Sequence, residues 1–379
     1  MWIFLAAILL VYALLHVYIF RRIRAAFPRR LRLHDVLRGF FFLMPVAPFV
    51  IHAVDTAGFP WAARVLGWIG YPWIALIFWS SGVLMAADVW NLAARGAAQA
   101  WPRARRAAIP PKSAVISAAI LVTLVSAWSL VEANALRSHE VWIQTAWLAP
   151  GAPPLRIVQI SDMHLSVERG PGVLRRVEKR IRELKPDLLV STGDLVDSTF
   201  KDIEALAEPL RNIRPPLGKF AVLGNHEYYS RLRNSLPFHE AAGFRLLRQE
   251  SVAVTPSLRL SGVDDPAGLH TGQPCFPDET KVLTRGDAGA FTILLKHQPL
   301  VLPDSIGRFD LQLSGHLHGG QLFPFNVVLR LLYPFGRGMY RLGDRSLLYV
   351  SRGAGTWGPP MRFLAPPEIC LLVLQPAGP

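Results

Sequence analysis

The stretch LQLSGHLHGG, residues 311–320, decides the fold of the C-terminal half of this chain. It joins an apolar run, Leu311–Leu313, to two histidines, His316 and His318, that are separated by one residue. Side chains two residues apart on an extended strand point to the same face, and the flanking glycines let the backbone turn sharply at the strand end. Both imidazoles can therefore reach one point, which suits a metal ion. The pair alone is a weak signal, so other segments must supply further ligands.

Four upstream segments supply them. Each is a predicted strand that ends in polar residues of the kind that bind metals. The runs 155–161, 188–192, 220–223 and 291–296 lead into Asp162 and His164, Asp194 and Asp197, Asn225 and His226, and His297. Taken singly, Asp162 could cap a helix, Asn225 could make a turn and His297 could lie in the core. Five strand ends of this kind follow one another along the chain. Together they favour a site at the carboxyl ends of strands, where open α/β sheets place their ligands.

These five motifs, D-x-H, G-D-x-x-D, G-N-H-E, a lone histidine and G-H-x-H, resemble those of the calcineurin-like metallophosphoesterases. The resemblance covers about residues 155–375. The tail with Ser351-Arg352-Gly353-Ala354-Gly355 and Pro366-Pro367-Glu368 is similar to the membrane-associated YkuE/YaeI-like branch. The family implies an α/β domain built as a β-sandwich of two mixed sheets flanked by helices, and an enzyme that hydrolyses phosphoric esters.

The resemblance also implies a role for each residue. One divalent metal ion would be held by Asp162, His164, Asp194 and His318, and a second by Asp194, Asn225, His297 and His316. Asp194 would bridge the two ions, and a water between them would attack the phosphorus in line. His226 would contact the phosphate and protonate or stabilise the leaving oxygen. Asp197 either orients a ligand or is a structural cap. Nitrogen and oxygen ligands without thiolate favour Mn, Fe or Zn over Mg alone.

Alternating patterns from Leu155 onward predict a strand-rich domain. Strands are expected at 155–160, 187–190, 220–223, 252–254, 258–260, 291–295, 311–313, 347–350 and 369–374. Helices are expected at 173–184, 203–213 and 235–242.

The first 140 residues are far more apolar than the rest of this 51% hydrophobic chain. Four runs, near 2–20, 38–54, 66–87 and 113–133, approach the roughly 20 apolar residues that cross a bilayer. Pro45 and Pro48 make the second run the least regular. The first run lacks the cleavage site of a signal peptide. We therefore expect an α-helical transmembrane region of about four spans over 1–137, a linker over 138–154 and the catalytic domain over 155–379.

Arginine placement predicts the orientation of the spans. Six arginines follow the first run within residues 21–32, and five basic residues lie in 95–112, whereas the loop between the second and third runs holds only Arg64. The two basic loops should be cytoplasmic. The expectation is a multi-pass inner or plasma membrane protein with its catalytic domain outside the cytoplasm.

The net charge of +14 does not indicate a nucleic-acid partner. Residues 1–150 hold 14 basic and 5 acidic residues, so most of the excess lies beside the predicted spans. The expected partners are the lipid bilayer and a phosphorylated lipid or envelope substrate, cleaved at a phosphodiester or pyrophosphate. One alternative is a UDP-diacylglucosamine-type pyrophosphatase of lipid A assembly, which the arginine pattern disfavours. Another is a non-catalytic metal-binding scaffold, which the complete ligand set disfavours.

Three features stay open from sequence alone. Trp142 and Trp147 either sit at the membrane interface or begin the first strand of the domain. Cys275 and Cys370 either form a disulfide or are separate thiols. The apolar segment 322–335, directly after the histidine pair, either packs on the sandwich or forms a lip that touches the membrane or an acyl chain.

Overall fold

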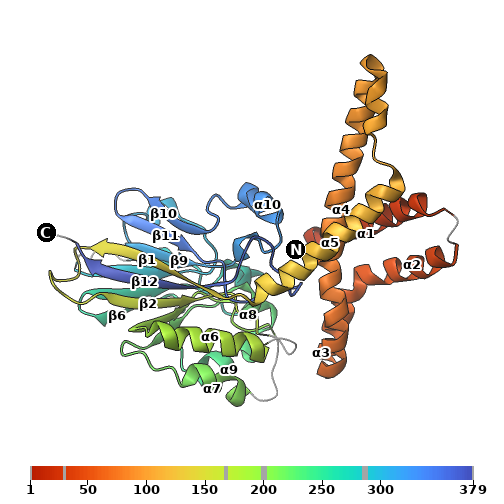
Figure 1. Cartoon of the computed structure of the whole chain (residues 1–379). Helices are drawn as coiled ribbons and strands as arrows, with labels where there is room; N and C mark the ends of the chain where they lie inside the picture. Colours follow the sequence, from red (N-terminus) through yellow and green to blue (C-terminus); the bar gives the residue numbers. More distant parts are fainter. Residues whose placement is uncertain (1, 29–30, 166–169, 198–202, 284–288, 378–379) are drawn as a thin grey trace. The chain divides into compact units, whose positions relative to one another are not determined.

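A computed structural model describes residues 2–28, 31–165, 170–197, 203–283 and 289–377 (Figure 1). The chain divides into two compact units. One comprises Met1–Val131 with Gly358–Met361, and the other comprises Glu132–Trp357 with Arg362–Pro379.

The first unit is helical. Its helices are α1 (Trp2–Ala26), α2 (Leu31–Leu43), α3 (Ala47–Thr56), α4 (Pro60–Ala100) and α5 (Pro111–Asn134), with short 3-10 turns at Met44–Val46 and Pro102–Ala107. Four stretches are long and apolar enough to cross a membrane, namely Ala6–Ala26, His34–Thr56, Trp61–Ala100 and Pro111–Asn134. The four predicted apolar runs therefore lie in four helical stretches of this length and composition. The second one is α2 and α3 joined through the turn that contains Pro45.

Polar contacts join α1 to α4 within this unit. Asp88 of α4 accepts a hydrogen bond from Tyr18 Oη at 2.6 Å and forms an ion pair with Arg22 at 2.9 Å. A carboxylate on a predominantly apolar helix is stabilised by such partners. The predicted third run, 66–87, lies inside α4, which continues to Ala100 with Pro72 in its interior.

The second unit contains two six-stranded sheets. The first has the order β1-β12-β2-β3-β4-β5 and the second β10-β11-β9-β8-β7-β6. The strands are β1 (Arg137–Thr145), β2 (Leu155–Ile160), β3 (Leu188–Ser191), β4 (Lys219–Ala221), β5 (Arg245–Leu246), β6 (Glu250–Thr255), β7 (Leu258–Gly262), β8 (Phe291–Leu295), β9 (Leu311–Ser314), β10 (Gly338–Leu342), β11 (Ser346–Val350) and β12 (Glu368–Pro376). The helices are α6 (Gly170–Leu184), α7 (Ile203–Arg211), α8 (Asn225–Tyr229), α9 (Leu232–Ala241) and α10 (Phe325–Leu332).

The sheets pack face to face, and strand periodicity explains why. Along β12, Ile369, Leu371 and Val373 face one apolar cluster, while Cys370, Leu372 and Leu374 face another. The first cluster lies under α6, α7 and α9, which cover the outer face of the first sheet (Figure 1). The second lies between the two sheets. The predicted sandwich of two mixed sheets flanked by helices is therefore confirmed.

The linker expected at 138–154 differs from the structure over its first half. Residues 138–145 belong to β1, which pairs in parallel with β12. Trp142 lies in this strand and Trp147 follows it. The tryptophans therefore belong to the first strand region of the domain, which is one of the two interpretations that the sequence left open. The strand is difficult to recognise from sequence because it lies at the sheet edge, where Arg137, His139 and Glu140 are exposed and only every second residue near its end is buried. Edge strands often carry such charged side chains.

Two other open features are resolved. Cys275 and Cys370 are free thiols, with Cys370 buried between the sheets. The apolar segment after the histidine pair forms α10 against the outer face of the second sheet. Leu329 and Tyr333 pack on the core there, whereas Leu331 and Leu332 are exposed. The inner side of this segment therefore packs on the sandwich, as the first interpretation has it, and contact of its outer side with a membrane stays a prediction.

Candidate metal centre

The site forms where the carboxyl ends of strands from both sheets meet. β2, β3 and β4 run parallel in one sheet, and β8 and β9 run parallel in the other. Hydrogen bonds tie their loops across the sandwich. Gln159 Nε2 donates to the carbonyl of Ser314 at 3.1 Å, and the N–H of His316 donates to Asp162 Oδ1 at 2.9 Å. The loops that carry the predicted ligands are therefore held together by the fold itself.

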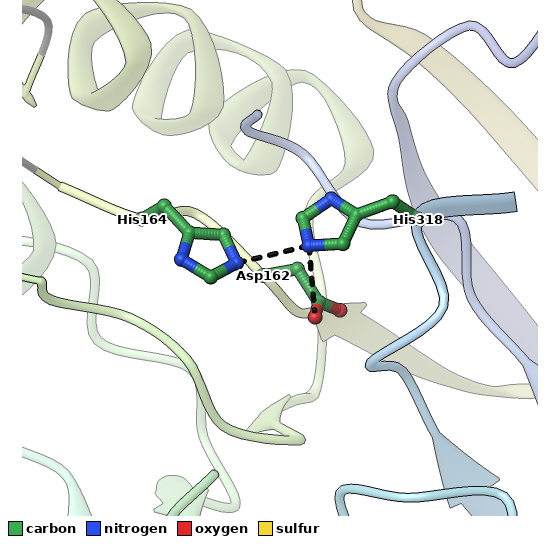
Figure 2. A group of neighbouring side chains, drawn as sticks. All are labelled: Asp162, His164 and His318. Atoms are coloured by element: carbon green, nitrogen blue, oxygen red, sulfur yellow. Dashed lines mark hydrogen bonds and ion pairs between the residues drawn. The ribbon is translucent and has the colours of Figure 1, made fainter. Parts of the chain in front are cut away.

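The first cluster of ligand atoms comes from the loops after β2, β3 and β9. His164 Nε2 lies 2.9 Å from His318 Nε2, and His318 Nε2 lies 3.6 Å from Asp162 Oδ1 (Figure 2). Figure 2 shows the two rings facing each other beside the Asp162 carboxylate. Asp194 Oδ2 approaches His164 Nε2 at 3.7 Å. The structure thus brings together all four residues predicted for one metal ion.

The second cluster comes from the loops after β3, β4, β8 and β9. His297 Nε2 lies 3.1 Å from Asp194 Oδ2 and 3.0 Å from Asn225 Oδ1. His316 Nδ1 lies 3.0 Å from Asn225 Oδ1 and 3.2 Å from His297 Nε2. The same oxygen, Asp194 Oδ2, therefore faces both clusters, a position that suits a carboxylate shared by two metal ions.

The donor set fits a cation. His297 Nδ1 donates to the carbonyl of Thr192 at 2.7 Å, which leaves a lone pair on Nε2 in the neutral ring. Asn225 Oδ1 and Asp194 Oδ2 also offer lone pairs at this point. Burial lowers the pKa of His297, but the Asp194 and Asp162 carboxylates outweigh burial and raise that pKa well above its usual range. Positive charge is therefore favoured where these atoms converge.

Two of the other histidines are neutral, the form that binds metals. Burial and the nearby His297 lower the pKa of His316 to about 3. Burial, His164 and Arg362 lower the pKa of His318 well below its usual range. Burial would raise the pKa of Asp194, but His297 and His226 hold it well below that of an ordinary carboxyl. The site therefore offers an ionised carboxylate and neutral imidazoles together.

Five of the predicted ligands adopt left-handed backbone conformations. Their φ angles are 51° at Asp162, 46° at His164, 54° at Asp194, 73° at His316 and 51° at His318. Residues other than glycine rarely occupy this region, and such strain concentrates at functional sites. The neighbouring loops are packed equally closely, because a Cβ on Gly224 would overlap Asp194 Oδ1.

Asp197 connects the first cluster to His226. Its Oδ1 accepts from His164 Nδ1 at 2.8 Å and from His226 Nδ1 at 2.9 Å. Burial lowers the pKa of His226, but Asp197 and Asp194 outweigh burial and raise it to about 9. His226 therefore carries a proton at neutral pH, and its Nδ1 is engaged with Asp197. Of the two roles predicted for Asp197, orienting a ligand is the one that matches its contacts.

Three further residues each contact one of the predicted ligands. Glu227 is fully buried and accepts from the N–H groups of Asp194 at 2.9 Å and Leu195 at 2.7 Å. Arg362, also fully buried, donates to the carbonyls of His318 at 3.2 Å and Ala365 at 2.9 Å. Tyr333 Oη lies 3.1 Å from His316 Nε2. Glu227 is the last residue of the G-N-H-E motif, but nothing local in the sequence marks Arg362 or Tyr333.

Comparisons with known proteins agree with this geometry. The family model for calcineurin-like phosphoesterases matches residues 155–320. A metallophosphoesterase of Aquifex aeolicus is 42% identical over 259 residues, which are 68% of this chain and 99% of that protein. The metallophosphoesterase YkuE of Bacillus subtilis is 35% identical over 65% of this chain and 87% of its own. A bovine transmembrane protein with a metallophosphoesterase domain is 34% identical over 73% of this chain and 64% of its own.

The similarity extends over nearly the whole Aquifex protein. The residues matched by the family model, 155–320, include the loops that carry the ligands described above. The helical unit, in turn, has the apolar stretches expected of a membrane-associated protein. The chain therefore belongs to the calcineurin-like metallophosphoesterase family, whose members are phosphoesterases that use divalent metal ions.

Proposed function

We propose that the protein is a membrane-tethered phosphoesterase with a dinuclear metal centre, and that it hydrolyses a phosphodiester or pyrophosphate of a lipid or envelope component. The observation that carries the proposal is the position of Asp194 Oδ2, 3.7 Å from His164 Nε2 and 3.1 Å from His297 Nε2. A single carboxylate that faces two clusters of lone pairs can serve two cations at once. Asp162, His164 and His318 would complete one site, and Asn225, His297 and His316 the other.

The metal ions, when bound, supply Lewis acidity and activate a water molecule. The chain supplies the remaining functions. Asp194 and the two ligand clusters would hold the ions that bind the phosphoryl group, and His226 donates a proton to the leaving oxygen from Nε2, the ring nitrogen that Asp197 leaves available. Asp197 positions His226 and His164 through a single oxygen. The general acid, His226, and the proposed metal ligand, His164, are therefore held in a fixed orientation relative to each other.

The proposed location is a multi-pass membrane with the catalytic domain outside the cytoplasm. The support is the placement of the basic loops at 21–32 and 95–112. Alkaline phosphatase, which is active only outside the cytoplasm, should be active when fused after Ala135. An active cytoplasmic reporter at the same junction would reverse this orientation and favour the lipid A pyrophosphatase alternative.

The experiment that tests the catalytic proposal is hydrolysis of bis-p-nitrophenyl phosphate by the full-length protein in detergent, with Mn²⁺ and after chelation. Activity should require the metal, and Asp194→Asn should abolish it together with most of the bound metal, because both ions lose a shared ligand. Metal content is measured by elemental analysis. A protein that binds two metal ions and yet cleaves no phosphodiester or pyrophosphate would instead be the non-catalytic scaffold.

A further inference from the structure

The outer face of α10 is apolar and exposed. Leu331 is 84% exposed and Leu332 69%, and Val327 and Val328 are also exposed. Leu329, on the inner face, packs against the core with Tyr333. A surface helix of a water-soluble domain normally turns its polar side chains outward. Here both the inner and the outer face are apolar, so water is a poor environment for this helix.

A neighbouring loop extends this surface. The N–H of Phe323, just before α10, donates to the carbonyl of Phe363 at 3.1 Å, and Arg337 Nη1 donates to the carbonyl of Leu364 at 3.1 Å. The Leu364 side chain is exposed as well. We call the exposed side chains of Val327, Val328, Leu331, Leu332 and Leu364 the α10 patch. Exposed apolar clusters of this kind mark contacts with proteins, membranes or ligands.

The entry of the chain into the domain lies beside the patch. Glu132, in the last turn of α5 and part of the domain's own compact unit, accepts from the N–H groups of Ala365 at 2.8 Å and Leu364 at 3.2 Å. Only two residues separate the end of α5 from the start of β1 at Arg137. α5 has the length and composition of a membrane span, and a span that ends two residues before β1 would bring lipid headgroups near this loop.

The charges around the patch suit a bilayer. Residues 321–342 contain Arg330, Arg337 and Arg341 and no acidic residue. Arginine binds phosphate through its planar, forked donors, and basic residues near a membrane favour anionic headgroups. A symmetric contact between two copies of this surface would bring like charges together. The bilayer is therefore favoured over a second copy of the chain.

The patch is also connected to the metal centre. Tyr333 directly follows α10 and places its Oη 3.1 Å from His316 Nε2. Tyr333 Oη also lies 3.5 Å from Gln298 Oε1, next to the ligand His297. A surface that rests on lipid at α10 would hold the metal clusters at a short, fixed distance from the headgroups.

We propose that the α10 patch inserts into the headgroup and acyl boundary of the bilayer that holds the helices, and that it presents lipid phosphoesters of this bilayer to the metal centre. Insertion of this kind is shallow, about 5–10 Å. The proposed insertion depends only on the exposed α10 patch and on the connection of the domain to α5. The second part rests on the proposed function and deepens it, because it names membrane-resident lipids as the substrate class.

Insertion is tested without reference to catalysis. Full-length protein with Cys275→Ser and Cys370→Ala receives one cysteine, Leu331→Cys, which is labelled with an environment-sensitive fluorophore and reconstituted in anionic vesicles. The matched control is Glu204→Cys, an exposed position on α7 at the opposite side of the domain (Figure 1). Lipids with a nitroxide near the headgroup end of the acyl chain should quench the label at 331 and leave that at 204 unchanged.

Two results would overturn insertion. One is a label at 331 that aqueous iodide quenches as readily as the label at 204, with no effect of nitroxide lipids. The other is energy transfer between labels at 331 on different copies without lipid quenching, which would identify a second copy of the chain as the occupant.

The substrate class is tested with the paired change Leu331→Ser and Leu332→Ser. Hydrolysis of the soluble diester should stay within about twofold, while turnover of a phosphodiester lipid in the same vesicle should fall roughly tenfold or more, because two large apolar side chains no longer partition into lipid. Leu329→Ser, on the inner face, is the contrasting control and should lower the melting temperature and both activities. Equal losses on both substrates in the paired variant would refute the presentation role. Hydrolysis of the soluble diester with no lipid cleaved by the unaltered protein would refute the lipid substrate while leaving the quenching result valid.

Discussion

Replacing Asp197 by Ala should weaken metal binding and slow catalysis at the same time. One oxygen of this carboxylate holds His164 at 2.8 Å and His226 at 2.9 Å. Removing the hydrogen-bond partner of a metal-ligating histidine typically lowers metal affinity about 10–100-fold. That range corresponds to about 1.4–2.7 kcal/mol, which agrees with the loss of one hydrogen bond to a charged group, about 1.5–3 kcal/mol.

The effect on His226 adds to this loss. Without Asp197, the His226 ring has neither its orienting partner nor the closest charge that favours its proton. At saturating metal, kcat should therefore fall further, by about 10–100-fold, which is less than the full contribution of a general acid. Asp197→Asn retains an acceptor oxygen but not the charge, so its kcat should lie between those of the unaltered protein and Asp197→Ala.

The assay measures the Kd for Mn²⁺ by calorimetry and kcat for bis-p-nitrophenyl phosphate at saturating metal. Melting temperature serves as the control for folding. If Asp197→Ala keeps both quantities within about twofold at an unchanged melting temperature, the carboxylate is only a structural cap and the reasoning from its two contacts is refuted.

Three other changes have distinct signatures. His226→Ala should retain metal and lose rate by about 10²–10⁴, so a variant that has lost its metal would show that His226 is a ligand instead. Glu227→Ala leaves the buried N–H groups of Asp194, Leu195 and Gly224 without their acceptor. It should lower the free energy of unfolding by about 3 kcal/mol or more, measured by denaturant titration against the exposed control Glu204→Ala. Lys219 donates to the carbonyls of Leu210 and Ala242, and burial, aided by Arg214, lowers its pKa from 10.5 to about 8. Between these two values the unfolded chain keeps a proton that the folded chain releases, so the stability of the unaltered protein relative to Lys219→Met should rise with pH across this window. A melting temperature of the unaltered protein that falls relative to that of Lys219→Met from pH 8 to pH 10 would contradict this expectation.

Strong periodic patterns made most of the fold predictable. β2 and β8 begin and end at the predicted residues, because each is a short, buried run bounded by polar turns. The extent of β1 is not predictable from its pattern because only one face near its end is buried, and its pairing with β12 depends on backbone hydrogen bonds that leave no local signature. Likewise, the apolar composition of α10 does not reveal which of its faces packs on the core.

The ligands could be proposed because each follows a recognisable strand and has a side chain that binds metals. The residues that support them could not be proposed from spacing. Glu227 lies 33 residues from Asp194, whose N–H it accepts, and Arg362 lies 44 residues from His318, whose carbonyl it binds. Such contacts arise from tertiary packing of loops, and no pattern within either loop indicates them.

The left-handed conformations of Asp162, His164, Asp194, His316 and His318 have a consequence for the newly made protein. Each such conformation costs an ordinary residue about 1–2 kcal/mol, and ligation of a cation is the interaction best placed to offset that cost. In a cell starved of divalent metal, these loops should open first while the sandwich beneath them stays folded. Proteases would then cut near the strand ends, so metal supply would govern the lifetime of the protein as well as its activity.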